Sequence, residues 1–268
     1  MITEPGIYDG VPEDTYHADT DLAPALGHSL SASGAKVLLK SPARYHYERT
    51  HPRASSDSMD LGSVAHELIL RTGTTVHVVD AYDWRGKADQ QTRKALRAKG
   101  VVVVNRPELR AAARRAAAVR AHPLASRIFT DGRPEVSLYW TDEGTGVTCR
   151  GRIDYLRERH IVDLKTARDA SPRGFAKAAA DYGYRESMAH YQRGVAALTG
   201  EWLPVVIVVV ESDEPHLVAV YTLSADDLAW GADRMDTALK TFAECESTGI
   251  WPGYSEDVEV LTFPQWAY

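Results

Sequence analysis

Residues 147–166, VTCRGRIDYLRERHIVDLKT, contain two extended runs joined by a short charged turn. In the second run Asp163 and Lys165 are two residues apart, so a strand would project both side chains from one face, about 7 Å apart. The turn is long enough to form a hairpin that brings Asp154 beside Asp163. The segment therefore predicts two carboxylates and an ammonium at one edge of a sheet. Such a group can hold a divalent cation and stabilise charge on a phosphate.

The alternation of apolar and polar residues predicts a sheet around this segment. Residues 135–140 and 147–154 alternate with a period of two, and the turn-rich residues 141–146 would join them as a hairpin. The expected core faces carry Val136, Leu138 and Trp140 in the first strand, Val147, Cys149, Gly151 and Ile153 in the second, and Val162 and Leu164 in the third. Residues 205–210, VVIVVV, predict a strand that is buried on both faces, and residues 217–223 predict its neighbour.

Helical periodicity and capping residues predict helices over 33–40, 59–70, 84–100, 107–122, 175–180, 182–199 and 225–248. Residues 1–30 lack periodicity and predict an extended arm. The fold class is therefore α/β, with a mixed central β-sheet flanked by helices. We expect one domain over 1–268, made of an N-terminal arm and helix (1–57), a basic helical insertion (84–127), and a catalytic sheet with closing helices (128–268).

Composition narrows the class of protein. With 268 residues, 44% of them hydrophobic, the chain can bury a substantial core. Its longest apolar stretch is strand-sized, and its first ten residues lack the pattern of a signal peptide. Cys149 and Cys245 form no metal-binding spacing and no disulfide framework. We expect a soluble protein of the bacterial cytoplasm with no membrane partner.

The distribution of charge is uneven. The net charge of −6 argues against a nucleic-acid partner, but residues 84–127 hold twelve Lys and Arg against Asp89 and Glu108 only. An excess of about ten positive charges is typical of a phosphate-binding surface. A solvated helical face, balanced by the acidic C-terminal region, explains the same count. Both interpretations stay open at this point.

Residues 42–53, PARYHYERTHPR, alternate aromatic and basic side chains. Tyr45 and Tyr47 stand among Arg44, Arg49 and Arg53. This mixture can stack on bases and bind phosphates. An aromatic-anchored surface segment accounts for it equally well.

Asp-x-Lys alone is a weak signal, since it also arises as a local ion pair on a surface strand. The ordered set is more specific: Gly62-x-x-x-His66, Glu135, Gly151-Arg152-Ile153-Asp154, Ile161-Val162-Asp163-Leu164-Lys165, and then Tyr191. This order resembles the PD-(D/E)xK nuclease superfamily, within it the RecE-like (exonuclease VIII) and RecB/Cas4-like branch, and it indicates a phage or prophage recombination exonuclease. The opening SLSASGAKVLLKSPARYHY is similar to that branch, and the resemblance covers residues 29–198.

The resemblance implies roles for individual residues. Asp154, Asp163 and Lys165 would be catalytic, and the metal ligands would be His66, Asp154, Asp163 and the backbone carbonyl of Leu164. Glu135 would bind a second ion or orient Arg152. Substrate contacts are predicted at Ser33, Lys36, Arg44, Tyr45, Lys87, Arg152, Tyr191 and Gln192. One position departs from the pattern, because Ser187 stands where the branch usually has glutamine, and Gln192 points from a different face of that helix.

The implied cofactor is Mg²⁺, since carboxylate oxygens suit hard cations, and an imidazole among them favours tolerance of Mn²⁺. An iron–sulfur cluster of the Cas4 kind is not expected, because it needs four cysteines and the chain has two.

The resemblance implies a metal-dependent DNA exonuclease that acts 5′→3′ on linear double-stranded DNA and leaves 3′ single-stranded tails. Expected partners are DNA ends, a single-strand annealing protein of RecT type, and further copies of the chain in a ring. A nuclease of other polarity, or an endonuclease, is the close alternative. A catalytically inactive DNA-binding homologue is less consistent with Asp154, Asp163 and Lys165 all being present, and an acidic structural protein leaves His66 unexplained.

Overall fold

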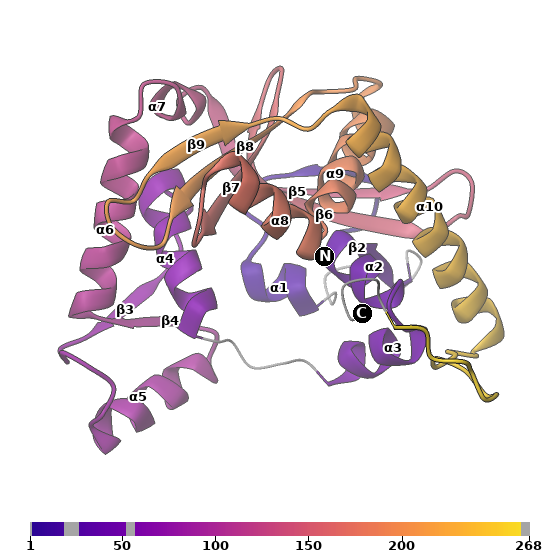
Figure 1. Ribbon diagram of the computed structural model, residues 1–268, viewed down its shortest axis with the longest axis horizontal. Helices are drawn as coiled ribbons and strands as arrows, with labels where there is room; N and C mark the ends of the chain where they lie inside the picture. Colours follow the sequence, from indigo (N-terminus) through magenta and orange to yellow (C-terminus); the bar gives the residue numbers. More distant parts are fainter. Residues whose placement is uncertain (1, 19–26, 52–56, 264–268) are drawn as a thin grey trace.

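The computed structural model describes residues 2–18, 27–51 and 57–263, and over these the chain builds a mixed sheet flanked by helices (Figure 1). The main sheet of the described residues has seven strands, in the order β1-β5-β6-β7-β8-β9, with β2 paired to β6. Their bounds are β1 (Gly6–Tyr8), β2 (Ser29–Ser31), β5 (Gly132–Thr141), β6 (Thr148–Arg157), β7 (Ile161–Ala167), β8 (Val205–Glu211) and β9 (Val218–Tyr221). The predicted fold class is confirmed.

The three central strands form the predicted antiparallel meander. The β5–β6 turn is closed by a hydrogen bond from the Asp142 amide to the Val147 carbonyl at 2.9 Å, and Gly146 takes the positive φ of 72° that the turn requires. Strands β6 and β7 then pair with Tyr155 opposite Val162. Because this register is fixed by apolar pairs, Asp154 must lie opposite Asp163, as the hairpin predicted.

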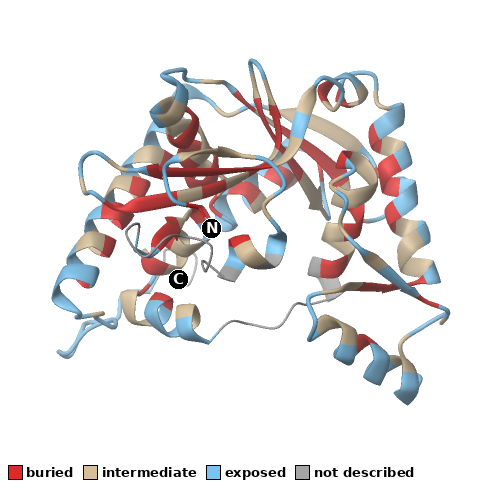
Figure 2. Cartoon of the chain, turned by 180° about the vertical axis from the view of Figure 1, so that it is seen from behind, coloured by how far each residue is buried: buried red, intermediate tan, exposed pale blue. Residues whose placement is uncertain are grey.

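Strand β8 is the most deeply buried strand, and it separates two hydrophobic clusters. It lies parallel to β7 and antiparallel to β9. Alternate residues serve the two faces: Ile207 and Val209 join one cluster, whereas Val208 and Val210 join the other. Figure 2 shows buried residues concentrated along the sheet and on the helix faces turned toward it. The expectation of a strand buried on both faces is confirmed.

Helices cover both faces of the sheet. The larger cluster draws on α2 (Ala32–Leu38), α3 (Pro42–Thr50), α8 (Pro172–Asp181), α9 (Tyr184–Thr199) and α10 (Ala225–Thr248). The smaller cluster lies under α4 (Asp57–Leu70), α6 (Arg106–Ala121) and α7 (Ala125–Ile128). Side chains of Ser31, Ser41, Ser171 and Ser224 accept amide hydrogen bonds at the starts of α2, α3, α8 and α10, and Gly200 and Gly249 end α9 and α10 with positive φ.

The N-terminal segment is more than an extended arm, and this corrects the sequence-based expectation. Strand β1 pairs antiparallel with β5, α1 (Glu13–Ala18) follows, and β2 pairs in parallel with β6. Tyr16 packs edge-on to Tyr139, whose ring centroid is 6.4 Å away, in a small cluster with Ile2. Three-residue strands and a six-residue helix are too short to show a period, so this docking could not be predicted from the sequence.

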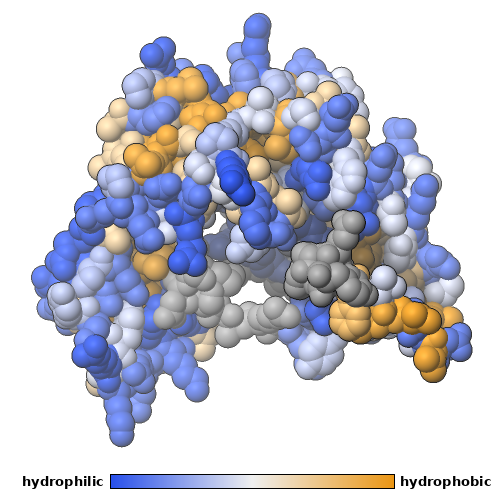
Figure 3. Space-filling model, viewed as in Figure 1, coloured by the Kyte–Doolittle hydropathy of each residue, from blue (hydrophilic) through white to orange (hydrophobic). Residues whose placement is uncertain are grey.

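A side lobe stands beside the main sheet, at the left of Figure 1. It contains a parallel two-stranded sheet, β3 (Val76–Val79) with β4 (Val102–Asn105), and the helices α5 (Lys87–Arg97) and α6. Asn105 caps α6 in a reciprocal capping box with Glu108. The lobe therefore starts before residue 84, because β4 needs β3 as its partner. In Figure 3 its surface is largely hydrophilic, and the molecule is hollowed beside it.

The described helices include none that is long and apolar enough to cross a membrane.

Candidate metal centre and catalytic cleft

Three carboxylates stand in one row across β5, β6 and β7. The pairs Pro134–Tyr155 and Val136–Ile153 flank Glu135 and Asp154, and so place these two acids opposite each other. The β6–β7 pairing ends at Tyr155–Val162, and continuing its register brings Asp154 beside Asp163. Like charges directly across a sheet are destabilising unless a cation lies between them. The row therefore has the electrostatics of a cation site.

His66, on α4, approaches this row from the side lobe. Its Nδ1 lies 3.7 Å from Glu135 Oε1 and its Nε2 lies 3.9 Å from Asp154 Oδ2. One ligand atom from each of His66, Glu135 and Asp154 falls within a span of 4.8 Å. His66 Nε2 is also 3.0 Å from the carbonyl oxygen of Leu164. The imidazole thus lies among the oxygen atoms that the sequence assigned as metal ligands.

Lys165 occupies the other end of the row. Its ammonium is 2.5 Å from Asp163 Oδ2 and 3.8 Å from Asp154 Oδ2. Asp154 also accepts a hydrogen bond of 2.7 Å from the amide of Leu164. Asp163 is 2% exposed and is held by Lys165, outside the three-residue group around His66. Asp154 therefore belongs to the group of possible metal ligands, whereas Asp163 forms an ion pair with Lys165.

The pKa values follow from this crowding. Burial opposes protonation of His66, but the Asp154 carboxylate and the hydrogen bond with Glu135 raise the pKa of its imidazole. Burial raises the pKa of Asp163 to about 6, against the attraction of Lys165. Burial disfavours the Lys165 ammonium, but Asp163 and Asp154 outweigh it and raise the pKa of the amine. Lys165 is therefore held as a cation at neutral pH.

The backbone at Glu135 is strained. Its φ is +49°, in the left-handed region that non-glycine residues rarely adopt. Such a conformation costs about 1–3 kcal/mol and persists only where the surrounding structure enforces it. Here it aims the carboxylate at His66 and Asp154. The donor set of two carboxylates, one backbone carbonyl and one imidazole suits Mg²⁺ or Mn²⁺.

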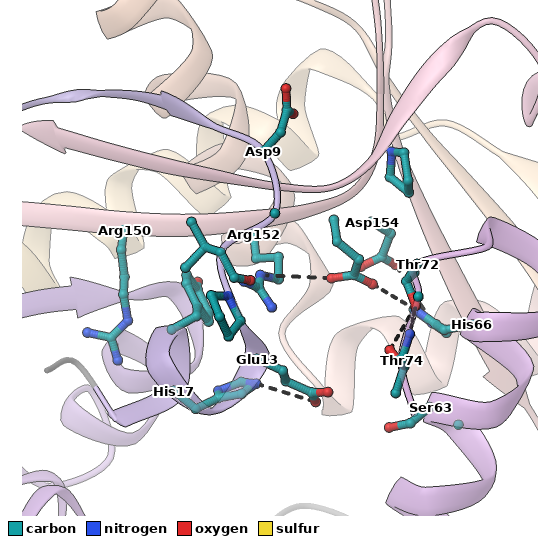
Figure 4. A pocket seen from close by; sticks show the side chains of 18 of the residues that line it. Asp9, Glu13, His17, Ser63, His66, Thr72, Thr74, Arg150, Arg152 and Asp154 are labelled. Carbon is teal, nitrogen blue, oxygen red and sulfur yellow. Dashed lines mark hydrogen bonds and ion pairs between the residues drawn. The ribbon is translucent and has the colours of Figure 1, made fainter. Parts of the chain in front are cut away.

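A cleft of about 940 Å³ opens beside these ligands, between the side lobe and the N-terminal segment. Figure 4 shows His66 and Asp154 on one side of the cleft and Arg150 on the other. Its walls include Ser33 from α2, Thr74 near β3, and Tyr191 from α9. The cleft is thus acidic around His66, Glu135 and Asp154, whereas the wall formed by the N-terminal segment and β6 mixes Arg150 with the acidic Asp9 and Glu13.

Comparison with known proteins identifies the fold. The sequence profile of a family described as "PDDEXK-like domain of unknown function (DUF3799)" matches residues 31–264. The chain belongs to this family. The prediction of the PD-(D/E)xK superfamily is thereby confirmed, whereas the RecE-like branch within it stays a prediction.

One solved structure shares the fold of this DUF3799 chain. The Eubacterium rectale protein named "Putative exonuclease" has a TM-score of 0.62 at 17% identity, over 95% of each chain. A phage related exonuclease from Haemophilus somnus 129PT gives a TM-score of 0.37 at 11% identity, over 83% of this chain and 96% of that one. No curated protein matches this chain.

Some of the predicted substrate contacts lie at the cleft of this DUF3799 chain. Ser33, Arg152 and Tyr191 line it. Arg152 donates to the Ser137 hydroxyl at 3.2 Å and to the Val11 carbonyl, and it lies 3.9 Å from Glu135. Arg152 therefore also fastens the N-terminal segment to the sheet.

The other predicted substrate contacts lie elsewhere. Tyr45 is buried against Phe242, and the neighbouring Arg44 donates to the Tyr254 hydroxyl at 3.2 Å. Gln192 donates to the Leu203 carbonyl at 2.8 Å. Tyr45, Arg44, Gln192 and Lys87 do not line the cleft. Lys36 does not line the cleft either, and its ammonium donates to the Tyr182 carbonyl and the Ser187 hydroxyl.

Of the two glycines in the motifs, Gly151 has a packing role and Gly62 does not. A Cβ on Gly151 would come within 3.1 Å of the Tyr191 ring, so the glycine lets α9 lie close to β6. Gly62, one turn before His66, faces open space instead, and close packing does not account for it. The sequence-based prediction did not include Arg150, Tyr16 and Thr74 as cleft residues. Arg150 could have been found, because the alternation of β6 places it on the same face as Asp154, whereas Tyr16 and Thr74 stand in no pattern that points to the cleft.

Proposed function

We propose that this chain is a metal-dependent deoxyribonuclease. The observation that carries the proposal is the convergence of His66, Glu135 and Asp154 beside the Leu164 carbonyl, with the Lys165 ammonium 3.8 Å from Asp154. Structural ion pairs seldom place several carboxylates side by side at the wall of an open cleft. Membership of a PDDEXK-like family supports the same conclusion.

The chemistry is hydrolysis of a phosphodiester. A divalent cation held by His66, Glu135, Asp154 and the Leu164 carbonyl would supply a Lewis acid for the phosphate and for the attacking water. Lys165 is kept protonated by its two carboxylate neighbours, and its charge would stabilise the negative charge that builds on the phosphate. Asp163 orients Lys165. The water oxygen bonds to phosphorus, the bond to the 3′ oxygen breaks, and the product carries a 5′ phosphate.

The finer proposal is an exonuclease that degrades linear double-stranded DNA 5′→3′ with Mg²⁺, and with Mn²⁺ tolerated. Its 3′ single-stranded tails would pass to an annealing protein of RecT type in recombination, and several copies would form a ring around the DNA. This proposal rests on the motif order from Gly62 to Tyr191. It leaves the direction of digestion to experiment, because no residue encodes polarity.

One assay tests these statements together. Linear duplex DNA labelled at the 5′ or the 3′ end is incubated with Mg²⁺ or with chelator, using wild type and Asp163→Ala. We expect Mg²⁺-dependent release of 5′ mononucleotides from the 5′ end, lost in the variant. Equal cleavage of covalently closed circles would reject the exonuclease and favour an endonuclease. Binding of DNA without any cleavage would favour an inactive homologue, and undiminished cleavage by Asp163→Ala would reject the site.

A further inference from the structure

A second group of side chains surrounds Lys165 on the side that does not line the cleft. The ring of Tyr184 lies 5.4 Å from the Lys165 ammonium. The ring of Tyr182 stacks on Tyr184, with centroids 6.0 Å apart and planes inclined by 24°. Tyr182 is 66% exposed. The turn between α8 and α9 thus exposes an aromatic ring, that of Tyr182, near Lys165.

Lys36 brings a second ammonium to the same place. From α2 its Nζ donates to the Tyr182 carbonyl at 3.0 Å and to the Ser187 hydroxyl at 2.9 Å. The path of its side chain depends on Gly183, because a Cβ there would lie 2.6 Å from Lys36 Cδ. Gly183 also has a positive φ of 65°, which favours glycine. Three segments of the chain therefore fix the position of the Lys36 ammonium: α2, the turn at residues 182–183, and the start of α9.

The surroundings of Lys36 favour an anion. An ammonium has three donors, and the contacts found among the described residues occupy two of them. Burial and, after it, the nearby charge of Lys165 lower the pKa of Lys36 to about 8, although the carboxylates of Glu186 and Asp163 act in the opposite direction. Two neighbouring ammonium groups repel each other, and a phosphate oxygen between them would relieve that repulsion.

We propose that Lys36 and Tyr182 form a subsite for one strand of nucleic acid beside Lys165. The Lys36 ammonium binds the backbone phosphate next to the one that is cut, and the Tyr182 ring stacks on an adjoining base. Exposed aromatic rings beside cations are the usual means of holding a single strand. The inference rests on the proposed nuclease function. It also gives Ser187 a role, since its hydroxyl holds the Lys36 ammonium in place.

A structural role for Lys36 is the competing explanation. Tyr182 is the C-terminal cap of α8, and a cation near a helix C-terminus stabilises the helix dipole. That role would change the melting temperature of the protein and leave its affinity for DNA unaltered. The dependence of DNA affinity on salt concentration distinguishes this structural role from the proposed phosphate contact. Only a phosphate contact contributes to the slope of log affinity against log salt.

The experiment measures binding of labelled single-stranded oligonucleotides in chelator, so that nothing is cut, at several salt concentrations. For Lys36→Met we expect the slope of log affinity against log salt to fall by about 0.7, and for Lys36→Arg to keep the wild-type slope. Tyr182→Ala should weaken binding roughly tenfold without changing the slope, whereas Tyr182→Phe should bind as wild type. The matched control is Lys177→Met, an exposed lysine of α8 paired with Asp181 at 2.5 Å, which should leave both quantities unchanged.

The results that overturn the inference are distinct from those that overturn the nuclease. An unchanged slope in Lys36→Met, together with wild-type affinity in Tyr182→Ala, rejects the subsite even if the wild type cuts DNA. A fall in melting temperature of Lys36→Met with an unchanged slope assigns Lys36 to helix capping. Failure of the wild type to cut DNA in Mg²⁺ rejects the proposed function, whereas the binding measurements still report on the subsite.

Discussion

The acidic row (Glu135, Asp154 and Asp163) and the basic side lobe (β3, β4, α5 and α6) differ in how their charges are compensated. Glu135, Asp154 and Asp163 stand side by side across three strands, where Lys165 contacts Asp154 and Asp163 and the Arg152 guanidinium lies 3.9 Å from Glu135. In the side lobe, by contrast, Arg93 and Arg97 both approach the buried carboxylate of Asp60. The first region keeps like charges together at a cleft. The second neutralises its charges internally.

Other arginines of the lobe are also occupied, two of them in ion pairs at the surface. Arg106 pairs with Asp80 at 2.6 Å and Arg114 pairs with Glu214 at 3.0 Å. Arg115 donates to the Ser212 carbonyl, and the Arg120 guanidinium donates to the Leu68 carbonyl. An excess of charge counted along the sequence therefore overstates what the lobe can offer to phosphate. Charge that the fold leaves uncompensated is the better sign of a binding site.

The largest effect should come from the acidic row. Asp154→Asn removes a carboxylate that faces both His66 and Lys165, and we expect cleavage to fall at least about a thousandfold, which corresponds to several kcal/mol. Calorimetry should show metal affinity lost in the same variant.

Lys165→Ala is the matched test, because it should lose turnover and keep metal binding. Loss of Mg²⁺ affinity in Lys165→Ala would instead make the lysine structural.

In the side lobe the expected effect is on stability. Arg93→Met removes one of the two guanidinium groups near Asp60, which is 3% exposed, while Arg97 stays 2.7 Å from that carboxylate. It also removes a cation 3.8 Å from Glu108 and exposes the Trp84 ring now covered by the guanidinium 4.1 Å away. Because Asp60 stays paired, we expect a loss of about 1–3 kcal/mol, in the range of an ordinary destabilising substitution. Unfolding in urea should show that loss.

The control for this comparison is the neighbouring Lys94→Met, since Lys94 is exposed. Its stability should change by no more than about 0.5 kcal/mol. If Arg93→Met unfolds at the same urea concentration as the wild type, the stability of the lobe does not depend on the ion pairs of Arg93. The contrast drawn between the acidic row and the side lobe is then wrong. A lower salt slope of DNA binding in Lys94→Met would show that the lobe also touches phosphate.

The acidic site was largely predictable because strands impose strict rules on side-chain direction. The alternation of β6 and β7 and the length of their turn were enough to place Asp154 beside Asp163. Glu135 could have been placed as firmly, since the 141–146 turn fixes the β5–β6 register and puts Glu135 opposite Asp154. His66 needed the resemblance, because no local rule says which strand a helix will pack beside.

The contacts of long side chains could not be predicted in the same way. Arg93 and Asp60 are 33 residues apart, and their pairing depends on how α5 folds back on α4. Lys36 reaches Ser187 across 151 residues, through space that exists only because residue 183 is glycine. Such contacts follow from tertiary packing. Composition alone gives the number of charges, and it does not give their partners.

A smaller effect should appear when the repulsion in the acidic row is relieved. Glu135→Gln removes one of two facing carboxylates, so the metal-free variant should be more stable than wild type by about 1 kcal/mol. The wild type should gain stability when Mg²⁺ or Mn²⁺ is added, by mass action, and the variant should gain less. Thermal unfolding with and without metal measures both. A variant that is less stable in chelator and gains as much from metal would remove Glu135 from the cation site.

The smallest effect concerns pH. The pKa of His66 is raised in the folded protein, because the attraction of Asp154 and Glu135 outweighs its burial. Its protonated form therefore stabilises the metal-free fold fully below the unfolded pKa of about 6.5, and that stabilisation is lost as pH rises through the higher folded pKa. The difference in unfolding free energy between wild type and His66→Asn should accordingly shrink above pH 6.5. Arg93→Met serves as the control variant, since the partners of Arg93 lie outside the acidic row. A constant difference between wild type and His66→Asn would mean that the imidazole does not balance the acidic row.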